Sequence, residues 1–217
     1  MIIQSREQID NKYILACCSI GGSPIHAGHT KHILDCKPSV LKYLNGVPPG
    51  QYNIDNIKLL VIVNCDSFLY RKHSFVFQSE NERAEIFDSL KSVDYTYIYQ
   101  SDGQTVADAL SYFQPDFFCK GGDRGIGTLP EDEIKAAKDN SVVILYGVGG
   151  SDKVTSSSDL IKRAANHYFY EKPVSDWLEE RNKYQFKDLM EYPADTISTK
   201  IDDYRNKIDR FYDSKFY

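Results

Sequence analysis

Residues 13–34 read YILACCSIGGSPIHAGHTKHIL and set out a strand, a turn and the start of a helix, in that order. The apolar run at 13–18 predicts a buried strand. The glycine-rich turn that follows lets backbone N–H groups approach an anion, and the N-terminus of the next helix adds a partial positive charge. Two histidines, His26 and His29, place side-chain donors at the same point. This stretch therefore predicts a phosphate-binding turn.

The rest of the chain repeats the alternation of strand and helix. Further strands are predicted at 57–64, 93–99, 116–120 and 141–146, and helices at 78–92, 104–113, 130–139 and 155–166. The run at 57–64 is almost entirely apolar, as expected at the centre of a parallel sheet that is covered on both faces. Alternating strands and helices predict an α/β fold, a doubly wound, Rossmann-like parallel sheet.

Two interruptions of this pattern shape the expected domain organisation. The first helix is expected to stop near Lys37, because the residue before a proline disfavours helical backbone. Residues 38–56 are then expected to form an inserted surface loop. From about Ala165 the composition becomes richer in charged helical segments. We expect a main α/β domain at 1–164 and a C-terminal helical extension at 165–217.

Charge and composition exclude several classes of protein. The formal net charge of -5 gives no basic surface for bulk nucleic-acid binding. No apolar run approaches the roughly 20 residues that cross a bilayer, and the first residues lack a signal-peptide pattern. The 5 cysteines are irregularly spaced and contain no CxxC pair, which favours buried core thiols in a reducing compartment. We expect a cytoplasmic protein without nucleic-acid or membrane partners, and its metal ligands are unknown at this stage.

Several polar residues follow predicted strands and so share one edge of the sheet. They are His26, Asp66, Lys72 and the glycine-rich segment 121–123. Ligands of doubly wound sheets bind beyond the carboxyl ends of the strands. The order of the elements therefore predicts that these residues meet at one binding site.

The four residues His26-Ala27-Gly28-His29 resemble the HxGH signature of the nucleotidyltransferase superfamily, which includes cytidylyltransferase-like and adenylyltransferase enzymes. Other segments resemble the same superfamily in the order it requires, at 63–66 with Arg71-Lys72, 79–86, 93–95, 115–123 and 155–161. The resemblance covers roughly residues 13–164. The core Lys120-Gly121-Gly122-Asp123 is typical of the heptose 1-phosphate adenylyltransferase branch, which makes ADP-activated heptose.

This resemblance implies a set of site residues. It implies three catalytic residues, which neutralise charge on the triphosphate: His26, His29 and Lys72. It also implies nucleotide- and phosphate-binding residues in three groups: Ile20, Gly21, Gly22 and Gly28; Lys120, Gly121, Gly122 and Asp123; and Ser156, Ser157 and Ser158. Magnesium is implied as cofactor by triphosphate chemistry rather than by a ligand motif.

The implied reaction is transfer of a nucleotidyl group from an NTP, with ATP favoured, to a sugar phosphate such as a heptose 1-phosphate, with release of pyrophosphate. The implied partners are the NTP and a phosphorylated small-molecule acceptor, and we expect a homodimer. Two departures from the superfamily keep alternatives open. The segment Gly21–Ile25 lacks the usual aspartate, and the segment Tyr146–Gly150 lacks the arginine that CTP-using relatives carry. The alternatives are a CTP-dependent cytidylyltransferase acting on glycerol 3-phosphate or another alcohol phosphate, and a catalytically silent nucleotide-binding module.

Overall fold

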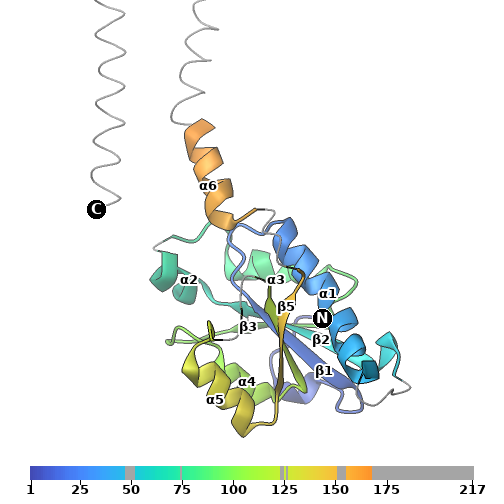
Figure 1. The fold of residues 1–217 in the computed structure, drawn as a ribbon. Coiled ribbons are helices and arrows are strands. Elements are labelled where there is room, and N and C mark those ends of the chain that lie inside the picture. Colours follow the sequence, from blue (N-terminus) through green and yellow to red (C-terminus); the bar gives the residue numbers. More distant parts are fainter. Residues whose placement is uncertain (47–51, 74, 123–124, 126, 151–154, 168–217) are drawn as a thin grey trace, which may run out of the picture. The chain divides into compact units, whose positions relative to one another are not determined.

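Five parallel strands form a single sheet in the computed structural model, which describes residues 1–46, 52–73, 75–122, 125, 127–150 and 155–167 (Figure 1). The strands are β1 (Ile14–Ile20), β2 (Ile57–Asn64), β3 (Tyr95–Tyr99), β4 (Phe117–Gly121) and β5 (Val143–Val148). Their order in the sheet is β3-β2-β1-β4-β5, and every neighbouring pair is parallel. The prediction of a Rossmann-like α/β fold is confirmed.

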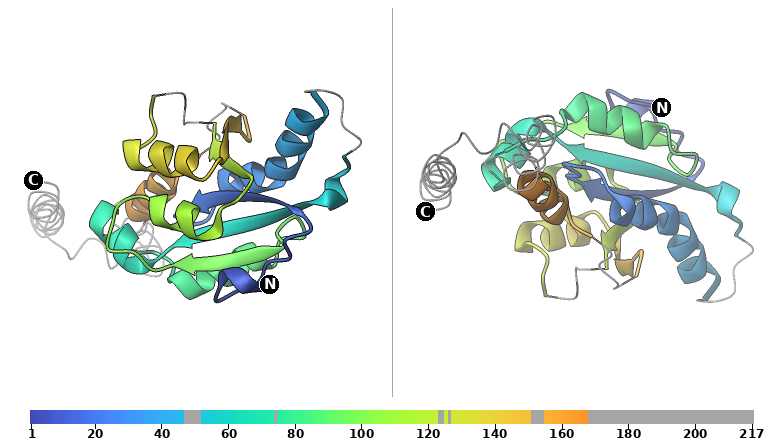
Figure 2. Two further views of the ribbon diagram at one scale, coloured as in Figure 1. Left: turned by 90° about the horizontal axis from the view of Figure 1, so that it is seen from below. Right: turned by 90° about the horizontal axis from the view of Figure 1, so that it is seen from above.

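Helices cover both faces of this sheet (Figures 1 and 2). The described residues form the helices α1 (Ala27–Gly46), α2 (Asp66–His73), α3 (Glu80–Asp88), α4 (Ala107–Phe113), α5 (Glu131–Asp139) and α6 (Ser157–Asn166), with short 3-10 turns at η1 (Arg6–Gln8) and η2 (Ile54–Asn56). The buried side chains of α1 and α3 pack on one face of the sheet, and those of α4 and α5 pack on the other. A three-layer arrangement results, with the sheet in the middle.

Strand β2 shows why the sheet needs both helical layers. Its side chains alternate between the two cores, with Leu60 and Ile62 in the α4–α5 layer and Leu59, Val61 and Val63 in the α1–α3 layer. All five side chains are completely buried. Each contributes about 1.5–3 kcal/mol relative to an exposed position, so the nearly continuous apolar run is what a central parallel strand requires.

Helix α1 does not stop near Lys37 as expected. It continues to Gly46 with Pro38 inside it, so the predicted surface loop at 38–56 is wrong for residues 38–46. Pro38 lies on the exposed side, whereas Cys36 and Val40 on either side of it are completely buried. Burial of this face outweighs the local cost of a helical proline, about 3 kcal/mol. Residues 47–51 of the expected loop lie outside the described residues.

Helix α2 replaces the basic loop that was expected around Lys72. The helix forms because Phe68 and Leu69 are buried against Cys65, in a small apolar cluster separate from the two main cores. Asp66 lies in the first turn, and the last turn carries Arg71 and two further basic residues. This charge distribution matches the helix dipole at both ends.

Asp94, directly before β3, ties α1 to the sheet. Its carboxylate binds Lys37 of α1 at 2.6 Å and Lys58 of β2 at 2.9 Å, and it accepts the Leu59 N–H at 2.8 Å. Burial alone would raise the pKa of Asp94, but the two lysines and the backbone donor hold that pKa below its ordinary value. The stability from these contacts is present above the unfolded-state pKa and is lost as pH falls through the folded-state pKa.

The chain divides into a first unit, Met1–Ser157, and a second unit that begins at Ser158. Most of the extension proposed at 165–217 lies outside the described residues, which end at 167. Within the part of the chain that the structure describes, no helix is both long enough and apolar enough to span a membrane.

Replacing Pro38 with alanine should stabilise the protein. Alanine restores an N–H that can bond to the carbonyl of Leu34, and it removes the ring from an exposed helical position. The expected gain in unfolding free energy is about 1–3 kcal/mol, measured by urea denaturation followed by far-UV circular dichroism. Lys42→Ala, at another exposed position of α1, is the control and should change stability by less than about 0.5 kcal/mol. Loss of stability in Pro38→Ala would show that the proline is required where it stands.

Candidate active site at the carboxyl edge of the sheet

The topology fixes where a ligand can bind. From β1 the chain winds to β2 and β3 on one side, and then crosses to β4 and β5 on the other. The order therefore reverses between β1 and β4. In open parallel sheets the binding crevice lies at this switch point, beyond the carboxyl ends of the strands. The segments that leave the two strands there are 21–26 and 121–122, two of the segments that the sequence predicted for binding.

The turn after β1 depends on the backbone freedom of glycine. Gly22 has a φ of +61°, a left-handed conformation that side chains with a Cβ rarely adopt. A Cβ there would also lie 3.1 Å from the Phe87 ring and 3.2 Å from Ile20. The turn is consequently tight against the α3 layer, and its backbone is held in one position.

Arg83 of α3 braces this turn from inside the protein. Its side chain is 0% exposed and its guanidinium donates to four groups. It binds the carbonyls of Gly21 and Asn64 at 2.7 Å each, the carbonyl of Gln78 at 3.0 Å, and Oδ1 of Asp66 at 2.7 Å. The planar five-donor fork of arginine suits such a set of acceptors. One buried cation thus joins the ends of β1 and β2 to the start of α3.

A second brace uses Ser23, in the segment where the superfamily carries an aspartate. Its hydroxyl oxygen accepts the N–H groups of Phe77 at 2.7 Å and Gln78 at 3.1 Å. The Gln78 side chain in turn accepts the N–H of Ile25 at 2.8 Å. The polar side chains of this turn are therefore committed to holding its backbone.

His26 and His29 lie together at the start of α1, as predicted. Their ring centroids are 3.9 Å apart, and both rings are partly buried. Nδ1 of His26 accepts the Gly28 N–H at 3.1 Å, and Nδ1 of His29 accepts the His26 N–H at 3.2 Å. Because each Nδ1 is an acceptor, a neutral ring carries its proton on Nε2. The backbone thus sets both imidazoles as Nε2–H donors.

Gly28 makes this pair of rings possible. A Cβ at position 28 would lie 2.8 Å from Cε1 of His26, closer than a side chain tolerates. On its other side, the same position faces the Thr155 carbonyl at 3.9 Å. Because Gly28 has no side chain, the His26 ring and the backbone of Thr155 can both lie close to it.

That second segment, 155–157, lies beside the turn. The Ser157 hydroxyl donates to the Pro24 carbonyl at 2.9 Å, and Ser156 is partly buried. The Thr155 hydroxyl is buried and has no hydrogen-bond partner among the described residues. Ser158, the last predicted serine, is exposed and belongs to the second unit. An orphaned hydroxyl next to the HxGH turn is what a polar ligand would satisfy.

The two predicted lysines differ in their surroundings. Lys72 is exposed in the last turn of α2. Lys120 forms an ion pair with Glu133 of α5 at 3.0 Å, and their side chains are 14% and 6% exposed. Glu133 also accepts the Val106 N–H at 3.2 Å, so a nearly buried carboxylate fixes the position of Lys120.

Of the glycines after Lys120, Gly121 ends β4 and Gly122 follows it, and both are partly buried. Asp123, which the sequence placed in the same group, lies outside the described residues.

Arg83 was not among the predicted site residues, although the sequence carries a signal for it. A cation stands one helical turn from Phe87 and beside Ala84, on the apolar face of an amphipathic helix. Glu133 shows the same feature beside Ala136 and Ala137 in α5. Charged residues on an apolar helix face are buried at a cost unless they are paired, so both indicate fixed polar networks.

Replacing Arg83 with lysine should destabilise the protein strongly. The lysine ammonium group cannot bind all four acceptors that the planar arginine guanidinium binds. Buried carbonyls and the Asp66 carboxylate therefore lose their hydrogen-bond donor. The expected loss in unfolding free energy is about 3 kcal/mol, measured by urea denaturation. Arg71→Lys is the matched control, because exposed Arg71 donates to the carbonyls of Ser101 and Gly103, and it should change stability by under about 0.5 kcal/mol. Equal stability of the two variants would contradict the bracing role.

Known proteins resemble this chain only distantly. No protein-family model matches it. Two curated proteins, each named bifunctional protein HldE, match 109 residues, or 49% of this chain, at 28% identity in Nitrobacter winogradskyi and 29% in Nitrobacter hamburgensis. The match spans only 21% of the length of each of those proteins.

Among solved structures, a lipopolysaccharide core biosynthesis protein from Thermoplasma volcanium is 21% identical, with a TM-score of 0.47 over 64% of this chain and 98% of that one. With a TM-score below 0.5, this likeness carries no weight for function. The chain is therefore distantly similar to the bifunctional HldE proteins, in agreement with the resemblance of its motifs to the cytidylyltransferase-like nucleotidyltransferase superfamily.

Proposed function

We propose that this chain is a nucleotidyltransferase that transfers the nucleotidyl group of ATP to a sugar phosphate such as a heptose 1-phosphate, with release of pyrophosphate. The observation that carries the proposal is the histidine pair at the sheet's switch point. Both rings present Nε2–H groups because the backbone occupies both Nδ1 atoms. Two preset donors at a helix N-terminus, after a glycine turn, suit a polyphosphate.

The proposed reaction needs positioning and charge neutralisation more than covalent chemistry. An oxygen of the acceptor phosphate attacks the α-phosphorus of ATP and forms the new P–O bond. The bond from that phosphorus to the oxygen bridging to the β-phosphate breaks, and pyrophosphate leaves with the electron pair. The acceptor is already an anion, so no general base is required. His26 and His29 stabilise the charge that grows on the α-phosphate, and Lys72 neutralises the β- and γ-phosphates.

The binding residues divide between the two phosphate-bearing substrates. Ile20, Gly21 and Gly22 serve the triphosphate through their backbone N–H groups, whereas Gly28, whose N–H is bonded to Nδ1 of His26, serves it by leaving room for the His26 ring. Hydroxyls at 155–157 bind phosphate, where the orphaned Thr155 hydroxyl supports a polar ligand. Lys120, Gly121 and Gly122, with Asp123, line the nucleotide and acceptor pocket.

Magnesium fits this edge of the sheet as a cation that arrives with the triphosphate. Mg²⁺ is commonly held by one or two carboxylates together with substrate phosphates and waters. Asp66 is suited to hold it, because its side chain is 39% exposed at the carboxyl end of β2 and only Oδ1 is engaged by Arg83. When bound, the cation supplies charge neutralisation to the phosphate oxygens.

Two features favour ATP and a heptose-type acceptor over the alternatives. Lys120-Gly121-Gly122-Asp123 resembles the core of the heptose branch, and the distant relatives are bifunctional HldE proteins. These features support the choice of substrate class, which the first experiment tests directly.

Pyrophosphate release should be measured with each of ATP, CTP, GTP and UTP, against heptose 1-phosphate and glycerol 3-phosphate as acceptors. We expect the highest kcat/KM with ATP and the heptose phosphate. A preference for CTP and glycerol 3-phosphate would replace the proposal with the cytidylyltransferase alternative. Nucleotide binding without turnover on any acceptor would favour a catalytically silent binding module.

The two histidines are tested by single substitutions, with activity measured on the nucleotide and acceptor that the wild-type protein uses best. His26→Ala and His29→Ala should each lower kcat by at least about a hundredfold, the scale of losing one preorganised donor. His73→Ala, an exposed histidine at the end of α2, is the control and should retain activity. Losses below about tenfold in both variants would remove the pair from the mechanism.

A further inference from the structure

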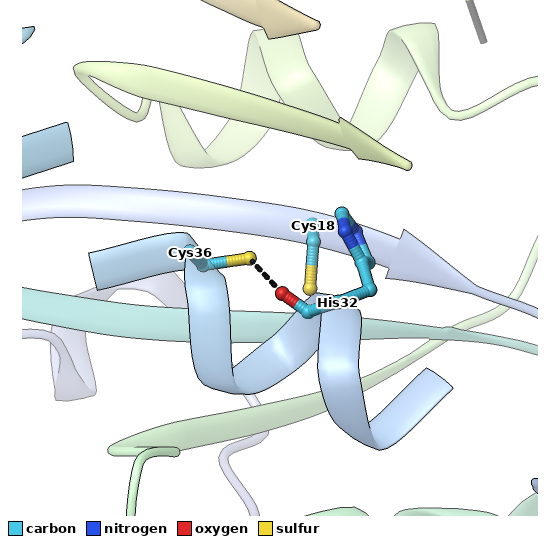
Figure 3. Close-up of side chains that lie close together, drawn as sticks. All are labelled: Cys18, His32 and Cys36. Atoms are coloured by element: carbon cyan, nitrogen blue, oxygen red, sulfur yellow. Dashed lines mark hydrogen bonds between the residues drawn. The ribbon is translucent and has the colours of Figure 1, made fainter. Parts of the chain in front are cut away.

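A second cluster of ligand-type side chains lies beneath α1, away from the HxGH rings. Cys18 comes from β1, and His32 and Cys36 come from one face of α1, a single helical turn apart (Figure 3). The two thiols and the imidazole each offer one donor atom, and all three atoms lie within 4.8 Å of one another. Both cysteines are completely buried, and His32 is partly buried.

The backbone prepares His32 as a ligand rather than as a donor. Its Nδ1 lies 3.0 Å from the Val148 carbonyl. A carbonyl can only accept, so Nδ1 carries the proton and Nε2 of the neutral ring keeps a lone pair. This is the opposite tautomer from that of His26, directly before α1, and of His29, in its first turn. A hydrogen bond from one ring nitrogen to a backbone carbonyl is the usual support of a metal-ligating histidine.

The neighbouring strand supplies one more thiol. Cys119 of β4 is 1% exposed and packs in the same core as Cys18 and Cys36. Strands β1 and β4 are paired, with Cys17 opposite Phe118, and Cys18 and Cys119 are the next residues along the two strands. Cys17 itself points to the opposite core.

We propose that Cys18, His32 and Cys36 bind a zinc ion beneath α1, with Cys119 as the fourth ligand. Three thiolates and one imidazole form a donor set of structural zinc sites, with Zn–S near 2.3 Å and Zn–N near 2.0–2.1 Å. Thiolate and imidazole donors select zinc over magnesium or calcium. The donor atoms of Cys18, His32 and Cys36 lie within 4.8 Å of one another and need only small side-chain movements to close around such an ion, whereas the Cys119 sulfur lies outside that group and has to move toward it. On binding, the thiols of Cys18, Cys36 and Cys119 release their protons to solvent. Cys36 also loses its 3.2 Å hydrogen bond to the His32 carbonyl.

The ion would join β1 and α1, the two elements that carry the phosphate-binding turn, to β4. Cys18 lies two residues before Ile20, His32 lies in the second turn of α1, and its ring is held to Val148 at the end of β5. Four protein ligands leave no open position, so the site is structural rather than catalytic. The inference does not depend on the proposed reaction. It concerns His32 as a metal ligand, whereas the reaction uses His26 and His29 as hydrogen-bond donors.

The experiment uses the full chain, purified under reducing conditions, freed of metal with a chelator and titrated with Co²⁺ as a spectroscopic probe. We expect binding of about one equivalent per chain, with thiolate-to-cobalt charge transfer and the intense visible bands of a tetrahedral site. Zn²⁺ should displace the probe and raise the thermal midpoint of the wild-type protein, a readout independent of activity and of any variant. Absence of stoichiometric binding and of these bands in the wild-type protein would overturn the proposal.

Variants assign the ligands. Cys36→Ala and His32→Ala should abolish the cobalt bands, whereas Cys17→Ala, on the same strand but in the other core, should keep them. Cys119→Ala should weaken binding by at least about tenfold, and unchanged affinity would show that this thiol is no ligand. Loss of the bands in Cys17→Ala to the same extent as in Cys36→Ala, with both variants folded by circular dichroism, would contradict the site.

Discussion

The candidate site depends on one buried guanidinium. Two of the groups that Arg83 binds, the carbonyl of Gly21 and the carboxylate of Asp66, follow two adjacent strands. Such backbone at the end of a sheet has no ladder partners of its own, and buried carbonyls left without donors cost free energy. The cation meets this need and at the same time fixes the shape of the turn. A tight turn whose N–H groups are held in place is the physical precondition for binding a phosphate.

Backbone hydrogen bonds determine the tautomers of His26, His29 and His32. At the start of α1, the Nδ1 atoms of His26 and His29 accept hydrogen bonds from backbone N–H groups. Nδ1 of His32 instead donates a hydrogen bond to the Val148 carbonyl. The first two rings are therefore donors that suit an anion, and the third offers a lone pair that suits a cation. One short segment thus presents hydrogen-bond donors at the sheet edge and a lone pair next to the buried thiols of Cys18 and Cys36 (Figure 3).

The sequence predicted what local pattern determines. The apolar run 57–64 became β2 with the same bounds, and the pair His26 and His29 lies together at the carboxyl edge as expected. Local rules failed where distant packing decides. Helix α1 continues past Pro38 because its other face is buried in the core, which no local signal reports. The contacts of Arg83 were likewise hidden, since they join strands and helices far apart in the chain.

The most direct test of the account is a crystal structure of the protein with a non-hydrolysable ATP analogue. The account predicts the triphosphate at the switch point between β1 and β4, with its oxygens within hydrogen-bond distance of the N–H groups of Gly21 and Gly22. The Nε2 atoms of His26 and His29 should contact the α-phosphate. An analogue bound at another edge, or imidazoles turned away from its phosphates, would contradict the central claim.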